Sequence, residues 1–238
     1  MTHQEELAKS KLVVVNLGAD LETLYQRDSS WFTEECLVFL REARQALLAD
    51  CYRASMIVAG EALLRAVYGV IWQGLEVGKS LSYQSRGNVK NLSATTWPDP
   101  RESWGYLNKK VPFDDALSVL GENRLCHPDT VRKIRIVQWL RNQATHGQFP
   151  LLDEWDPYDP RDENEFRKLL RGQSEHSEGY RFKHPDKEIG WIRFECRQHA
   201  VGSLKPLSPD GRFAAITFRY VVEALDEFAQ LSGNSAAT

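Results

Sequence analysis

Four stretches of the chain repeat apolar residues at intervals of three and four, which places them on one face of an α-helix. They span approximately residues 33–48, 50–70, 128–147 and 213–231. A helix with one apolar face is stable when a neighbour covers that face. The four stretches therefore predict helices that pack together as a bundle, the first two as an antiparallel pair joined by a tight turn.

The segments between these helices have a different composition. Residues 74–111 are rich in Gly, Ser and Pro, which predicts a long connection anchored by tryptophans and followed by a short helix at 114–120. Residues 148–210 contain six prolines and many charges, with an alternating stretch at 190–196. That alternation predicts an inserted module with one or two strands, including a hairpin with residues 180–182.

The predicted fold class is thus all-α, a four-to-five-helix bundle with a small inserted loop or β-hairpin module before the last helix. We expect an N-terminal arm at residues 1–30 and a bundle built from 31–147 and 211–232. The module occupies 148–210.

The amino-acid composition and net charge exclude some classes of function. The chain has 238 residues, 42% of them hydrophobic and 26% charged, with a net charge of -3. Such a charge does not support a broad nucleic-acid-binding surface, so any RNA contact must be focused. The four cysteines form no CxxC pair, and no stretch approaches the ~18 apolar residues of a membrane span. We expect a cytoplasmic protein without a leader or membrane segment.

The candidate chemistry lies at the end of the third helix, where four residues separate Arg141 from His146 and Gly147 follows. Arginine is always cationic and grips phosphate well, and histidine has the unperturbed pKa closest to neutral. On a straight helix these side chains lie roughly 140° apart. A helix end at Gly147 would free His146 to turn toward the arginine. Alternatively, Arg141 and His146 are only capping residues at a helix end.

The stretch Arg141-Asn142-Gln143-Ala144-Thr145-His146-Gly147 resembles the R-x(4-6)-H motif of the HEPN superfamily, including the Asn that often follows the Arg. Residues 51–64 resemble the family's alanine-rich helix with an embedded Glu, here Glu61. The resemblance covers residues 33–76, 112–147 and 212–231.

This resemblance implies a helical homodimer and, in many members, a metal-independent endoribonuclease without a cofactor. His146 would be the general base or acid in attack of a ribose 2′-hydroxyl on the adjacent phosphate, and Arg141 would stabilise the charged phosphorus. The products would carry 2′,3′-cyclic phosphate and 5′-hydroxyl ends. Such enzymes serve as toxins, with an antitoxin as partner, or in antiviral defence. Other relatives are non-catalytic modules that bind nucleotides or protein partners, which is the alternative function.

Three further residues are candidates for substrate binding: Asn142, Thr145 and Glu61. Asn142 would orient the phosphate or the histidine. Glu61 has a simpler alternative, an ion pair with Arg65 one turn along its helix.

The remaining features favour structural roles. His127, before Pro128, is expected to cap or flank the third helix. The histidines at 176, 184 and 199 match no metal-ligand template, so no metal site is predicted. The tryptophans offer stacking platforms for RNA bases, although core packing is their more frequent use.

Overall fold

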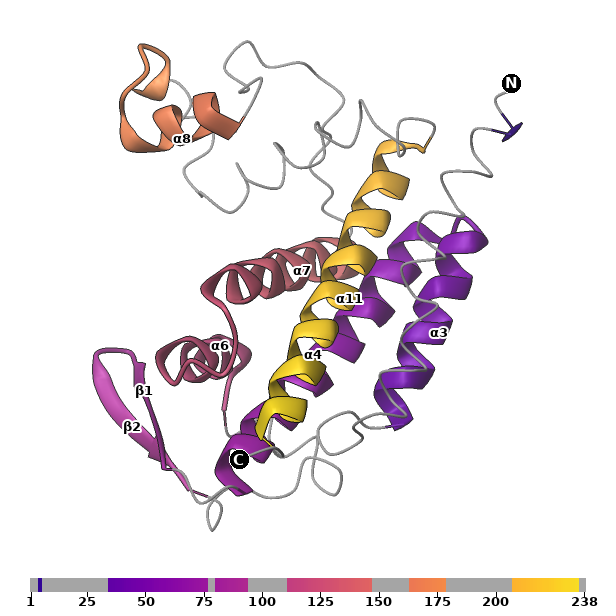
Figure 1. The fold of residues 1–238 in the computed structure, drawn as a ribbon. Coiled ribbons are helices and arrows are strands. Elements are labelled where there is room, and N and C mark those ends of the chain that lie inside the picture. The colour runs from indigo at the N-terminus through magenta and orange to yellow at the C-terminus, as the bar shows by residue number, and fades with distance from the viewer. Residues whose placement is uncertain are drawn as a thin grey trace.

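The structure is a computed structural model that describes residues 4–5, 34–76, 80–93, 111–146, 163–178 and 207–235. Within these ranges the chain is predominantly helical, with a single two-stranded hairpin (Figure 1). The elements in chain order are α3 (Glu34–Leu48), α4 (Tyr52–Glu76), β1 (Leu81–Ser85), β2 (Asn88–Leu92), α6 (Phe113–Glu122), α7 (Pro128–His146), α8 (Glu163–Arg171) and α11 (Pro209–Ser235).

Helix α4 is the centre of the fold. It packs against α3, α7 and α11, and these four helices share one apolar core (Figure 1). Its own sequence is apolar on most sides, so Ala59, Leu63, Val67 and Ile71 are all at most 1% exposed. The four long helices predicted from apolar spacing are confirmed.

The length and composition of α4 would also suit a membrane span over Tyr52–Leu75, but 72% of that window is buried inside the protein. Neighbouring helices cover the apolar surface that lipid would otherwise cover. This burial is typical of a core helix.

Small residues let α3 and α4 approach closely. The buried Ser55 hydroxyl donates a hydrogen bond to the Ala43 carbonyl oxygen across the pair, at 2.8 Å. The chain reverses at Asp50, whose φ of 58° lies in the left-handed region. The predicted antiparallel pair is thereby formed with a turn of only three residues, 49–51.

The start of α7 is held by contacts from its own flank and from α11. The Asp129 amide donates to His127 Nδ1 at 3.2 Å, so the predicted capping role of His127 is confirmed. The Glu227 carboxylate accepts hydrogen bonds from the His127 amide and the Thr130 hydroxyl. The contacts of the Asp129 and His127 amides satisfy backbone donors that a helix amino terminus leaves without internal partners.

A β-hairpin lies where the sequence predicted only a connection. Strand β1 pairs antiparallel with β2, and Ser85 faces Asn88 across a two-residue turn. Both turn residues, Arg86 at 50° and Gly87 at 80°, have positive φ, as the favoured hairpin turn requires. The prediction of an irregular 74–111 segment was therefore wrong for residues 81–92.

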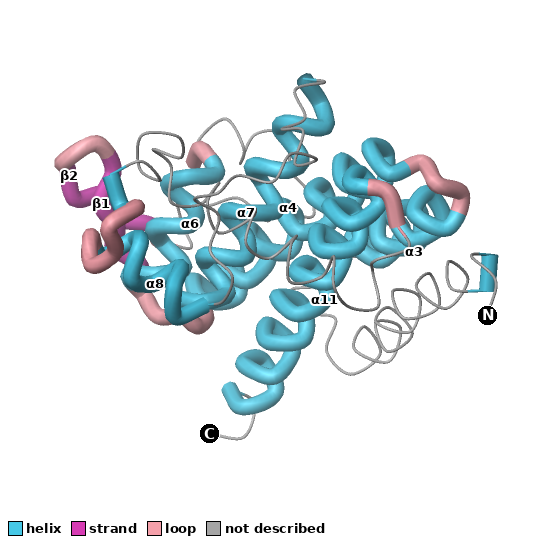
Figure 2. The backbone as a smooth tube through the Cα atoms, turned by 90° about the horizontal axis from the view of Figure 1, so that it is seen from above, coloured by secondary structure: helices cyan, strands magenta, loops and turns pink. Residues whose placement is uncertain are grey.

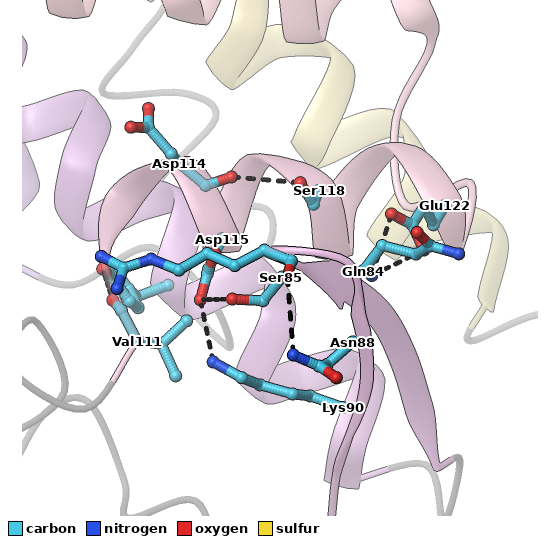
Figure 3. A network of polar contacts seen from close by, with 11 residues as sticks. Gln84, Ser85, Asn88, Lys90, Val111, Asp114, Asp115, Ser118 and Glu122 are labelled. Atoms are coloured by element: carbon cyan, nitrogen blue, oxygen red, sulfur yellow. Dashed lines mark hydrogen bonds and ion pairs between the residues drawn. The ribbon is translucent and has the colours of Figure 1, made fainter.

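Two carboxylates of helix α6 bind residues of this hairpin. Asp115 accepts a hydrogen bond from the Ser85 hydroxyl at 2.9 Å and pairs with Lys90 at 3.5 Å (Figure 3). The Glu122 carboxylate accepts from the Gln84 amide at 3.1 Å. The hairpin and α6 lie at the opposite side of the molecule from α3 (Figure 2).

The predicted module at 148–210 contains a helix that the sequence interpretation did not include. Helix α8 buries Phe166 and Leu169, and neither belongs to the core shared by the four long helices. The strand segments predicted at 180–182 and 190–196 lie outside the described residues, as do Trp97, Trp104 and nearly all of the N-terminal arm.

Candidate functional site

The carboxyl-terminal half of α7 determines where the motif side chains point. Leu140 and Ala144 are buried in the core, which turns the opposite side of the helix outward. Arg141 lies at the flank between these two sides and reaches toward α4. The helix continues through His146, its last residue.

Arg141 is held between two neighbours. One terminal nitrogen, Nη2, pairs with Glu61 Oε1 of α4, and the other, Nη1, donates to Asn142 Oδ1 at 3.3 Å. The Arg141 and Glu61 side chains are 30% and 26% exposed, so the pair is partly accessible to solvent. The structure thus brings together three of the predicted site residues, Arg141, Asn142 and Glu61.

The expected alternative for Glu61, an ion pair with Arg65, was wrong. Arg65 Nη1 contacts Glu35 of α3, and its guanidinium lies 4.9 Å from the centroid of the Phe39 ring. These two partners draw Arg65 toward α3, while the Glu61 carboxylate faces α7. The carboxylate is therefore available to the motif arginine.

Gly60 allows the arginine stem to lie close to the backbone of α4. A Cβ atom at this position would be 2.8 Å from Arg141 Cγ and 2.9 Å from Arg141 Cβ, closer than carbon atoms can approach. The absence of a side chain at residue 60 is thus a condition for the observed arginine position. Gly60 was not among the site residues predicted from the sequence.

Thr145 and His146 occupy the exposed end of α7. The Thr145 hydroxyl donates to the Arg141 carbonyl oxygen at 2.9 Å, a bond within its own helix. Among the described residues no contact joins His146 to Arg141. Because the helix is regular up to His146, their directions differ by about 140°. One chain therefore does not assemble the complete Arg-His pair.

The amino-terminal half of α7 and helix α11 form a second charged cluster, which was not predicted from the sequence. Lys133 Nζ pairs with Glu223 Oε2 of α11 at 2.7 Å, and Arg219 Nε pairs with Glu223 Oε1 at 2.8 Å. Burial by itself raises the pKa of Glu223, but hydrogen bonds and charge from Lys133 and Arg219 outweigh it and leave the pKa below its usual value. The i,i+4 spacing of Arg219 and Glu223 was the available sequence signal.

Metal chemistry has no candidate site in the described part of the chain, since no group of three His, Cys, Asp or Glu side chains there is arranged to hold an ion. His176 lies beside Glu175 at 3.4 Å after α8, while the histidines at 184 and 199 lie outside the described residues.

Comparisons with protein-family models, with curated proteins and with solved structures found nothing that matches this chain. The candidate site is therefore defined by its own residues and geometry.

Proposed function

We propose that this protein is a metal-independent endoribonuclease of the HEPN type, with a helical bundle that acts as a homodimer. The observation that carries the proposal is the placement of Arg141, clamped by Glu61 over Gly60, five residues before the exposed His146 at the end of the same helix. An arginine fixed in this way is preorganised to meet the charge that develops on a phosphate.

In the proposed reaction a general base removes the proton of a ribose 2′-hydroxyl, and the 2′-oxygen attacks the adjacent phosphorus. The bond from phosphorus to the 5′-oxygen breaks, and a general acid protonates that oxygen. His146 is the proton-transfer group, and Arg141 neutralises the phosphoryl oxygens. The products are a 2′,3′-cyclic phosphate and a 5′-hydroxyl end.

The proposal requires two copies of the motif. Arg141 and His146 of one chain point in different directions, so a complete site needs helix ends from both protomers. Asn142 lies between them around the helix and would orient either the phosphate or the imidazole, and Thr145 would add a hydroxyl.

A decisive test is RNA cleavage in EDTA by wild type, His146→Ala and His176→Ala, with mixed cellular RNA as substrate. His176 is a suitable control because it is an exposed histidine outside the α7 motif. We expect His146→Ala to lower the cleavage rate roughly a hundredfold or more, the scale of general acid–base catalysis. His176→Ala should cleave like wild type. Equal rates for wild type and His146→Ala would exclude the assignment.

A second candidate function is a non-catalytic module of the same fold that binds a nucleotide or a protein partner. One specific observation favours it: the Glu61 carboxylate already neutralises Arg141 in the single chain. This candidate predicts a folded dimer that cleaves no RNA. Arg141→Ala would then change stability or partner binding alone.

A further inference from the structure

Helix α7 has an outward side of which the proposed reaction uses only the carboxyl-terminal end. Arg135 is exposed, Trp139 and Asn142 are half-buried, and His146 is exposed. At about 100° per residue, Arg135, Trp139 and His146 lie within roughly 40° of one another around the helix. They form a row about 16 Å long, given a rise of about 1.5 Å per residue.

The charge of α7 differs from that of the whole chain. The helix carries four cations, Arg132, Lys133, Arg135 and Arg141, and one acid, Asp129, so four minus one gives +3 without His146. The complete chain has a net charge of -3. Three of these cations pair with carboxylates, Arg132 with Asp129, Lys133 with Glu223 and Arg141 with Glu61. The cation that α7 presents to a focused anionic contact is the exposed Arg135.

Trp139 is the aromatic member of the row. Its side chain packs against the shared core but stays partly accessible. An aromatic ring that packing already holds loses little conformational freedom when a base stacks on it. Stacking also needs an unpaired base, so the geometry favours a single strand over a duplex.

We infer that a single RNA strand lies along the outward side of α7, with Trp139 stacking on a base and Arg135 contacting a phosphate, and leads to His146. This inference rests on the proposed function and adds the path of the substrate. Trp139 and Arg135 are substrate-binding residues in this scheme and take no part in proton transfer.

The test measures binding separately from cleavage. The probe is a short fluorescein-labelled single strand with 2′-O-methyl groups, which lacks the attacking hydroxyl and stays intact with wild-type protein. Fluorescence polarisation gives Kd for wild type, Trp139→Leu, Trp139→Phe, Arg135→Gln and Arg41→Gln. Arg41 is the matched control because it is an exposed arginine on α3.

Trp139→Leu should weaken binding about fivefold or more, since it keeps an apolar side chain but loses the stacking surface. Trp139→Phe should retain most of the affinity, whereas a purely structural role would give Leu and Phe similar effects. Arg135→Gln should reduce the slope of log Kd against log salt by about 0.7, the value for one phosphate contact on a single strand. Arg41→Gln should leave the slope unchanged.

The outcomes separate this inference from the proposed function. If wild type cleaves RNA through His146 while Trp139→Leu and Arg135→Gln bind like Arg41→Gln, the inferred path is wrong and the nuclease assignment stands. If no variant cleaves but Trp139 and Arg135 still govern binding, the path stands and the nuclease assignment fails. Absence of binding to the single strand, or a preference for a duplex of equal length, overturns the path. Arg135→Gln keeps the inference testable if the tryptophan variants do not fold.

Discussion

The amino-terminal half of α7 is held by two carboxylates of α11, and the carboxyl-terminal half is held by one carboxylate of α4. Glu223 contacts Lys133 in the first half, and Glu227 contacts Thr130 there and His127 just before the helix. Glu61 contacts Arg141 in the second half. Both halves therefore use a carboxylate from a neighbouring helix. A cation paired with a carboxylate of a neighbouring helix therefore does not by itself distinguish a functional end of α7 from a structural one.

The two halves differ in the side chains that are exposed near these cation–carboxylate pairs. At the first half, Glu223 is shared between Lys133 and Arg219, and the exposed His127 uses its Nδ1 atom to cap the helix. At the second half the exposed Thr145 and His146 follow the clamped arginine. An exposed histidine at a helix end that also carries a positioned guanidinium is compatible with phosphate chemistry once a second protomer completes the site, and this contrast yields four predictions.

The largest expected effect is on the cleavage rate, when each of the two paired cations of α7 is replaced by the other basic residue type. Arg141→Lys retains the positive charge but loses the planar fork that matches a phosphate, so under the proposed function cleavage should fall roughly a hundredfold or more. Lys133→Arg should leave the cleavage rate near wild type. Single-turnover rates on labelled RNA measure both. Similar losses in the two variants would mean that Arg141 acts only as a structural clamp.

The next effect concerns stability at the start of α7. Glu227→Ala removes the acceptor for the His127 amide and the Thr130 hydroxyl, so the free energy of unfolding should fall by about 1.5–3 kcal/mol. Asp226→Ala, at the adjacent exposed position, should change it by less than about 0.5 kcal/mol. Urea denaturation compares the two. Equal changes would show that Glu227 does not anchor α7.

A third prediction uses two helical glycines. Gly60→Ala should destabilise the protein by about 1–3 kcal/mol, because the new methyl group displaces the Arg141 stem. Gly121→Ala in α6 should stabilise it by up to about 1 kcal/mol, since the nearest atom, Val131 Cγ2, is 4.0 Å from the added carbon. Thermal unfolding followed by circular dichroism gives the sign of each change. A stabilising Gly60→Ala would contradict the close approach at residue 60.

The smallest expected effect is a pH dependence at Glu223. Its pKa in the folded protein lies below the ordinary value of 4.5, so the ionised carboxylate stabilises the fold above about pH 4.5. That stability is lost as the pH falls through the lower folded-state pKa. Glu223→Gln should therefore show a weaker loss of stability than wild type on acidification below pH 4.5. Parallel pH profiles of the unfolding free energy would contradict the ion-pair assignment.

Part of the fold and of the candidate site could be predicted from local patterns in the sequence. The apolar spacing of the four long helices was decisive because a helix places residues three and four apart on one face, whatever surrounds it. The start of α7 was also predictable, since His127 caps a helix whose first residue is Pro128. The candidate residues Arg141 and His146 came from their spacing and the following glycine.

The hairpin and the partner of Glu61 depended on contacts between distant parts of the chain. The hairpin escaped prediction because its strands are short and carry polar residues such as Ser82 and Gln84, and carboxylates of α6 help to hold it. Glu61 had Arg65 one turn away in sequence, yet it contacts Arg141, 80 positions along the chain. The sequence by itself determined the helices and the motif, since both are local patterns. Only the tertiary structure decided that Glu61 faces Arg141, because the packing of α4 against α7 sets that direction. It also showed that α7 stays regular through His146, which keeps the two motif side chains about 140° apart.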